Sequence, residues 1–153
     1  MKFDVATPYT AVFVILRRGN TVAFVLRSDT GWMDGYYGLP SGKVEHNEPM
    51  SIAAVREAQE EIGVTIASSD LRHVLTEHRN GADDGTLWVD LYFEVSNWEG
   101  EPYNAEPDKH SELAWLDMHN LPDNIIPSVK YSLEQIAAGT TYAEFGWDAT
   151  QHA

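Results

Sequence analysis

Three carboxylates gather near the end of one short predicted helix. Glu57, Glu60 and Glu61 belong to the stretch "REAQEE", so they stand three or four residues apart and share one side of a helix. Like charges at this spacing repel by roughly 0.2–0.5 kcal/mol per pair. The cluster is therefore either a solvated helix face or a place where a positive group binds. Taken alone, the six residues are more typical of a solvated face.

Carboxylate oxygens are also the ligands that Mg²⁺ and Mn²⁺ prefer, which gives the cluster a second interpretation. Ions held there can polarise a phosphoryl oxygen, activate water and clamp the leaving oxygen. Arg56 precedes the acids, and its guanidinium can fork onto a neighbouring carboxylate. The pattern is thus compatible with hydrolysis of phosphate esters or anhydrides.

The helix that carries the acids must hold them beside a buried surface. We expect it to begin after Asn47, a candidate N-cap, with Pro49 in its first turn and Gly63 at its end. One side of this helix carries an apolar stripe at helical spacing, made of Val55, Ala58 and Ile62. The acids flank this stripe, which predicts that they lie at the margin of a cleft.

The rest of the chain mixes strand and helix patterns. Strands are predicted at 9–17, 21–27, 70–79, 85–98 and 112–118, and a second helix at 126–139. Turn-forming residues predict an ordered loop over 29–49 and a turn over 80–85. The aromatic tail 140–153 either packs against the rest of the protein or forms a dimer contact, and its sequence does not place it. Hairpins and crossovers occur together, so we expect a mixed sheet covered by helices.

Size and composition restrict the class of protein. A chain of 153 residues predicts a single domain over 1–153. The absence of cysteine excludes disulfides and thiolate metal sites, and a net charge of −14 argues against binding of duplex nucleic acid. No apolar run reaches the roughly 18 residues of a membrane span, and the first residues lack a signal-peptide pattern, so we expect a cytoplasmic protein without membrane contact.

A longer pattern surrounds the acids and changes their interpretation. Gly42 is followed after five residues by Glu48, and after seven more by "REAQEEIGV", which ends at Val64. This spacing matches G-x5-E-x7-R-E-U-x-E-E-x-G-U, in which U is apolar, at every defined position. A chance match in such a chain is on the order of 10⁻⁷. The segment 42–64 resembles the Nudix box, and the chain resembles the Nudix hydrolases.

The resemblance implies an α/β fold, an α/β/α sandwich around a mixed sheet that covers about residues 5–138. In the family the helix of the box carries the metal ligands, which implies that Glu57, Glu60 and Glu61 bind Mg²⁺, with Mn²⁺ as a substitute. Glu57 is also the candidate for activating water.

Other positions of the box acquire roles through the same resemblance. Arg56 would orient the water-activating glutamate, Gly42 and Gly63 would be structural, and Glu48 would support the loop. Family members often have a Gly-Gly pair before the box, and the carbonyl of the first glycine ligates metal. Ser41 stands there in this chain, and its carbonyl can still serve, although its side chain leaves the conformation of the loop open.

The stretch "WEGEP", residues 98–102, resembles a segment of the MutT-type nucleoside triphosphate pyrophosphohydrolases. A glutamate four residues after that proline is a further metal ligand in those enzymes, which implies the same role for Glu106, with a solvated loop acid as the alternative. Arg27 lies fourteen residues before Ser41, like a phosphate-binding arginine of those enzymes, or is an ordinary surface charge. Lys43 either screens phosphate charge or pairs with an acid.

The base-binding residues are less clearly marked. Asn124 either hydrogen-bonds a base edge or belongs to the turn "PDN". Aromatic residues near the box either stack on a base or anchor their loop; they are Trp32, Tyr36 and Tyr37.

These resemblances imply a metal-dependent enzyme in which water attacks an inner phosphorus of a nucleoside triphosphate, giving a nucleoside monophosphate and pyrophosphate. The alternative substrates are ADP-ribose, a nucleotide sugar or a dinucleoside polyphosphate. A different class of function is a non-catalytic nucleotide sensor, against which the intact "REAQEE" argues. In each case the partner is a small nucleotide, and the protein is a monomer or a homodimer.

Overall fold

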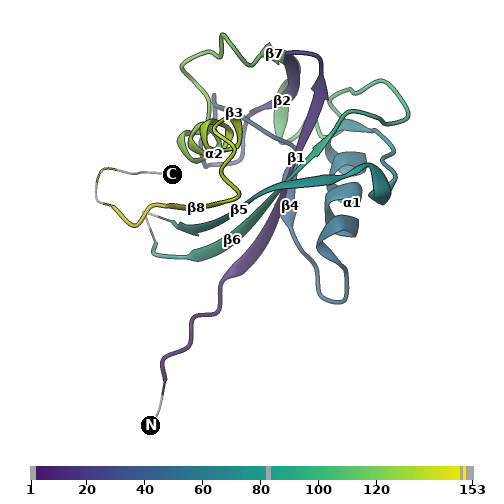
Figure 1. Ribbon diagram of the computed structural model, residues 1–153. Coiled ribbons are helices and arrows are strands. Elements are labelled where there is room, and N and C mark those ends of the chain that lie inside the picture. Colours follow the sequence, from purple (N-terminus) through teal and green to yellow (C-terminus); the bar gives the residue numbers. More distant parts are fainter. Residues whose placement is uncertain (1–2, 82–83, 149, 151–153) are drawn as a thin grey trace.

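The computed structural model describes residues 3–81, 84–148 and 150 (Figure 1). Its strands are β1 (Tyr9–Arg18), β2 (Thr21–Arg27), β3 (Tyr37–Gly38), β4 (Ser41–Lys43), β5 (Arg72–Asn80), β6 (Leu87–Val95), β7 (His110–Asp117) and β8 (Tyr142–Phe145). Its helices are α1 (Met50–Ile62) and α2 (Pro127–Ala137), with a 3-10 turn, η1, at Ser68–Asp70. Parts of the expected turn 80–85 and of the expected tail segment 140–153 lie outside the described residues.

The strands form one mixed sheet with β1 near its middle. The order along the sheet is β3-β2-β1-β6-β5-β8, while β4 pairs with β1 and β7 pairs with β2. Strand β1 runs parallel to β6 from Tyr9 to Leu16, and β5 runs parallel to β8; the other pairs are antiparallel. Only the last two residues of β1 pair with β2, so the sheet opens between β2 and β4 beside β1.

The two helices cover opposite faces of this sheet (Figure 1). Because side chains alternate along a strand, Val12, Val14 and Leu16 of β1 pack in the cluster that contains α1. Ile15 packs in the cluster that contains α2, and Phe13 lies against that cluster. The predicted α/β/α sandwich with a mixed sheet is confirmed. No helix among the described residues has the length and apolarity that a membrane crossing requires.

Helix α1 differs at its start from the sequence prediction. The N-cap position is Pro49, which has extended backbone and makes no side-chain capping hydrogen bond, so the predicted N-cap at Asn47 is wrong. Asn47 instead adopts a left-handed conformation with φ of 69°, which suits a turn two residues before the helix. The predicted end is confirmed, since Gly63 has φ of 70° and donates from its backbone N–H to Gln59.

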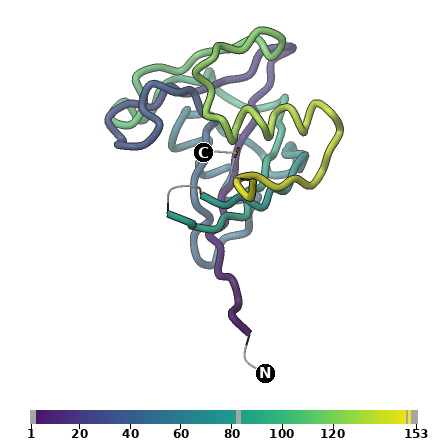
Figure 2. Tube along the Cα trace, turned by 90° about the vertical axis from the view of Figure 1, so that its left-hand side faces the viewer, coloured from purple at the N-terminus to yellow at the C-terminus, as the bar shows by residue number. Residues whose placement is uncertain are grey.

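Two segments contain more regular structure than their composition predicted. The expected loop over 29–49 includes the short strands β3 and β4, and β4 carries the beginning of the box. The part of this loop that follows β2 lies beside the segment that precedes β7 (Figure 2), where Ser28 donates to the carbonyl of Lys109. The tail adds β8 to the sheet edge, and Phe145 packs there in a buried position.

Candidate active site

Helix α1 presents two of its acids to strand β4 in a buried position. Glu57 and Glu61 are 8% and 9% exposed, whereas the Glu60 side chain is 50% exposed. Gly42 of β4 is in such close contact with Glu57 that an added Cβ would overlap the carboxylate. The glycine at the start of the box is therefore what allows the backbone of β4 to approach this acid.

Arg56 connects the acids with the loop that precedes the helix. Its Nη2 and Nε donate to the two carboxylate oxygens of Glu48 at 2.7 and 3.1 Å, and its Nη1 donates to Oε1 of Glu57 at 2.8 Å. The same Nη1 contacts Oε2 of Glu60 at 3.3 Å, and Nη2 reaches the carbonyl of Lys43 at 3.1 Å. The contacts that an orienting role for Arg56 and a loop-supporting role for Glu48 require are thus present.

The negative charge of Glu61 is less well compensated than that of Glu57. Its Oε2 accepts a 3.2 Å hydrogen bond from the backbone N–H of Ser41. Burial raises the pKa of Glu61 well above its usual range, and repulsion from Glu57 and Glu106 adds to the shift. Burial also raises the pKa of Glu57, partly offset by its bond to Arg56. Both carboxylates would therefore gain from a bound cation.

The loop before β7 brings a fourth acid to this neighbourhood. Glu106 repels both Glu57 and Glu61, and its side chain is 19% exposed. Lys109 makes an ion pair with it at 2.9 Å, and the backbone N–H groups of Lys109 and His110 donate to the Glu106 carbonyl. The spacing after "WEGEP" thus places this glutamate close enough to the helix acids to affect their charge.

The carboxylates do not converge on one point in the structure. Among residues 3–81, 84–148 and 150, no three His, Asp or Glu side chains lie close enough together to hold a metal ion. Glu57 and Glu60, which were predicted to bind a metal ion, accept hydrogen bonds from Arg56 in this structure. The donor chemistry nevertheless fits a hard divalent cation, because the two buried acids repel each other and offer oxygen ligands. The ligand set stays a prediction.

A cavity of about 830 Å³ adjoins this acidic margin. At one side it is lined by Ser41, Gly42 and Glu61. Its cations are Arg27, Lys43, Arg79 and Lys109, and its apolar lining is Ala11, Phe13, Val25, Leu39, Ile126 and Val129. It combines acids that suit a metal, cations that suit phosphate and an apolar surface that suits a flat ring.

The three predicted substrate contacts lie in different surroundings. Arg27 lines the cavity, where its Nε donates to the carbonyl of Trp32 at 2.8 Å and its guanidinium lies 5.0 Å from the centre of that ring. Lys43 also lines the cavity, with its Nζ 4.7 Å from the centre of the Tyr9 ring. Asn124 lies in the turn before α2 and donates to the carbonyl of Gly35 at 2.9 Å. Its contact with a base stays a prediction.

Several cavity residues were not identified from the sequence. Lys109 and His110 follow Glu106 at a short distance, but neither belongs to a motif. The Nδ1 of His110 is buried without a hydrogen-bond partner among the described residues, and burial lowers the pKa of this imidazole. Arg79 on β5 and Trp88 on β6 lie opposite each other in the hairpin. Only the register of the two strands could have predicted this pair.

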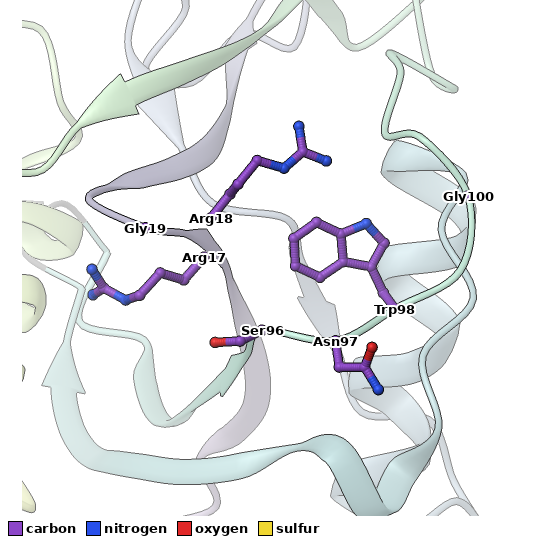
Figure 3. A pocket seen from close by; sticks show the side chains of 7 residues that line it. All are labelled: Arg17, Arg18, Gly19, Ser96, Asn97, Trp98 and Gly100. Atoms are coloured by element: carbon purple, nitrogen blue, oxygen red, sulfur yellow. The ribbon is translucent and has the colours of Figure 1, made fainter.

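A second hollow, of about 630 Å³, lies at the turn between β1 and β2 (Figure 3). Arg18 and Trp98 point toward each other there, while Arg17 points away. The guanidinium of Arg18 lies 4.4 Å from the centre of the Trp115 ring and forks onto Glu101 at 3.1 and 3.3 Å. Its donors are thus engaged within the protein, and the first cavity is the better candidate for the active site.

Comparisons with known proteins show which family this chain resembles. The NUDIX domain model matches residues 7–136. The chain is 33% identical over 114 residues to the 8-oxo-dGTP diphosphatase of Escherichia coli strain K12, covering 73% of this chain and 85% of that protein. It is 36% identical over 94 residues to the 8-oxo-dGTP diphosphatase of Proteus vulgaris, covering 61% and 80%.

The solved structures give the same family. A MutT NUDIX hydrolase from Burkholderia pseudomallei superposes with a TM-score of 0.78 at 28% identity, covering 85% of this chain and 98% of that one. The resemblance carried by the box from Gly42 to Val64 is thus confirmed. The chain belongs to the Nudix hydrolase family as a MutT-like member, and is a pyrophosphohydrolase.

Proposed function

We propose that this enzyme is a metal-dependent nucleoside triphosphate pyrophosphohydrolase that releases a nucleoside monophosphate and pyrophosphate. The observation that carries the proposal is a cavity that Glu61 lines together with four cations and an apolar surface. Two of its relatives are 8-oxo-dGTP diphosphatases, which supports a purine deoxynucleoside triphosphate as the substrate class.

The cations are arranged to bind a chain of phosphates beside the acids. Arg27 and Lys109 both act on the charge of Glu61, so they lie near the acidic margin. Lys43 enters from β4, one residue after Gly42. Cations that surround a polyphosphate offset its charge and fix its position, which brings the inner phosphates to the acids.

The acids would hold a divalent cation, Mg²⁺ or Mn²⁺. Glu57, Glu60, Glu61 and Glu106, with the carbonyl of Ser41, are the residues that would bind it. Such a cation supplies charge compensation for the phosphates and lowers the pKa of bound water.

In this proposal Glu57 accepts a proton from the attacking water. Arg56 occupies its Oε1, and among the described residues none donates to its Oε2. Burial raises the pKa of this carboxylate, which improves it as a proton acceptor near neutral pH. The water oxygen then bonds to an inner phosphorus, the anhydride bond between the α- and β-phosphates breaks, and pyrophosphate leaves.

A substrate and product screen tests the proposal. Purified protein with Mg²⁺ is incubated with canonical deoxynucleoside triphosphates, 8-oxo-dGTP, ADP-ribose and nucleotide sugars. We expect monophosphate from triphosphates, and inorganic phosphate that is released only after inorganic pyrophosphatase is added. Glu57→Gln is the control for a contaminating phosphatase. Hydrolysis of ADP-ribose or nucleotide sugars with no hydrolysis of any triphosphate would overturn the proposal.

A further inference from the structure

A buried ion pair lies at the wall of the cavity, three strands along the sheet from β4. Arg79 on β5 donates from Nε and Nη2 to the two oxygens of Asp90 on β6, at 2.5 and 3.1 Å. The Asp90 side chain is fully buried and that of Arg79 is 12% exposed. The guanidinium also lies 4.9 Å from the centre of the Trp88 ring. Its position is therefore fixed by a carboxylate and by an aromatic face.

The fork with Asp90 leaves part of the guanidinium available. Arginine has five N–H donors and no acceptor, and Asp90 receives two of them. Among the described residues none accepts a hydrogen bond from Nη1. Since Arg79 lines the cavity, these remaining donors can serve a ligand.

The local charge at Arg79 suits a neutral ligand group better than phosphate. Asp90 neutralises the guanidinium, and the buried Glu77 lies directly opposite Asp90 in the register of β5 and β6. Of the other cavity cations, Lys109 is paired with Glu106 at 2.9 Å, whereas Arg27 and Lys43 make no ion pair among the described residues. We therefore expect an anionic phosphate to bind beside Arg27 and Lys43 in preference to Arg79.

Arg79 and the nearest predicted phosphate-binding cation flank one aromatic ring. Strands β4 and β5 are separated by β1 and β6, but their side chains converge, with Lys43 Nζ 5.7 Å and the Arg79 guanidinium 4.9 Å from the centre of the Trp88 ring. Between these strands the cavity wall is apolar, with Ala11 and Phe13 of β1 on one side and Ile126 and Val129 at the start of α2 on the other. A flat base fits this wall when the phosphates lie at the acids.

We propose that Arg79 selects the base of the substrate, favouring a base with a carbonyl oxygen at the edge that faces it over a base with an amino group there. The inference rests on the proposed function and adds a specificity-determining residue to it. Guanine carries such an oxygen at O6 and thymine at O4, whereas the same positions of adenine and cytosine carry amino donors. The guanidinium only donates hydrogen bonds, so it can bind the carbonyl oxygen of guanine or thymine but not the amino group of adenine or cytosine. Asp90 acts through Arg79 as a positioning residue.

The test uses two substrates that differ at the six-position of the purine. Hypoxanthine carries a carbonyl oxygen where adenine carries an amino group, so kcat/KM is measured for dITP and dATP. We expect the wild type to favour dITP by about tenfold or more, the range of a hydrogen bond to a charged group. Arg79→Met should bring the ratio close to one, and Arg79→Lys should fall between them because a point charge replaces the fork.

A double variant and a matched control separate selection from folding. Arg79→Met leaves Asp90 buried without a partner, so Arg79→Met with Asp90→Leu removes both charges and should show the same lost preference. Arg18→Met is the control, because Arg18 is also paired with a carboxylate and stacked on tryptophan, but in the other hollow. Its ratio should equal that of the wild type.

Binding of the monophosphates distinguishes this inference from the proposed function. Calorimetry with dIMP and dAMP needs no turnover, and we expect tighter binding of dIMP by the wild type and equal binding by the double variant. If no triphosphate is hydrolysed but this preference is observed, the proposed function fails and the role of Arg79 stands. A wild type that binds both equally or neither, or a double variant that keeps the preference, overturns the role of Arg79.

Discussion

Two sets of buried carboxylates face opposite sides of the sheet and are compensated in different ways. In the α2 set, on β5 and β6 under α2, Arg79 donates to both oxygens of Asp90, and the Ser132 hydroxyl donates to Glu77 at 2.6 Å. In the α1 set, Arg56 is shared among Glu57, Glu60 and the preceding Glu48, and Glu61 receives a single backbone N–H. Burial raises the pKa of acids in both sets, so burial alone does not distinguish them.

The supply of positive charge is what separates the two sets. In the α2 set Asp90 has its own counter-charge in Arg79. Glu77 has none, since its Oε1 lacks a hydrogen-bond partner among the described residues and burial raises its pKa to about 7. In the α1 set, Glu61 lines the cavity and makes no ion pair among the described residues, and burial and repulsion from Glu57 raise its pKa. We therefore expect an external cation to bind there. The comparison predicts that the first set matters mainly for stability and the second mainly for catalysis.

The largest expected effect is on stability, at Asp90. Asp90→Ala leaves the buried guanidinium of Arg79 without its partner, so the free energy of unfolding should fall by about 3–5 kcal/mol in urea denaturation. Glu101→Ala removes the carboxylate from the exposed pair with Arg18 and should change stability little. Equal losses of stability in the two variants would contradict the distinction between buried and exposed ion pairs.

Catalysis should respond most strongly at the helix acids. Glu57→Gln and Glu61→Gln remove charge but little volume, so circular dichroism should match the wild type while turnover at saturating Mg²⁺ falls by roughly a hundredfold or more. Glu101→Gln, on an exposed loop, should turn over like the wild type. Near wild-type turnover in either helix variant would remove that residue from the site.

The pH dependence of stability should reveal Glu77. Its pKa in the folded protein is about 7, chiefly because of burial, compared with a usual 4.5. Between these values the unfolded chain has released a proton that the folded protein keeps, so stability falls as pH rises toward 7 and then stays constant. Relative to Glu77→Gln, the wild type should lose about 2–3 kcal/mol between pH 4.5 and 8 in urea denaturation. A difference that is independent of pH would show that Glu77 is ionised when folded.

A smaller effect is expected at Glu106, which reaches the site from a loop. Glu106→Gln should weaken apparent metal affinity and lower turnover less than the helix variants do, and high Mn²⁺ should restore part of the activity. Turnover is measured against metal concentration, with Glu101→Gln as the control of equal charge but wrong spacing. Curves that overlay the wild type would remove Glu106 from the ligand set.

Short-range patterns predicted much of the fold. Alternating apolar residues identified the long strands. Gly63 marked the end of α1 because this position has a left-handed backbone conformation, which glycine adopts readily. The start of the helix was missed because Asn47, a good capping residue by type, is used in a turn. Strand β8 was missed because its pairing with β5 joins segments distant in the sequence, which no local pattern encodes.

The site divides in the same way. The box predicted Glu57 and Glu61 because their spacing is a local property, and its glycine, Gly42, leaves the space that Glu57 occupies. The ion pair of Arg79 with Asp90 depends on the register between two strands, and neither residue belongs to a motif. Spacing therefore indicated the reacting end of the cavity, and only tertiary structure indicated the other end.

The central claim is that the α1 acids form a site for an external cation, whereas Asp90 and Glu77 of the sheet do not. Melting temperature measured against Mn²⁺ concentration, without nucleotide, tests it directly. Metal that binds the folded state raises the melting temperature by mass action. We predict a rise in the wild type and in Glu77→Gln, and a much smaller rise in Glu61→Gln. A wild type that does not respond, or a Glu61→Gln variant that responds equally, would contradict the account.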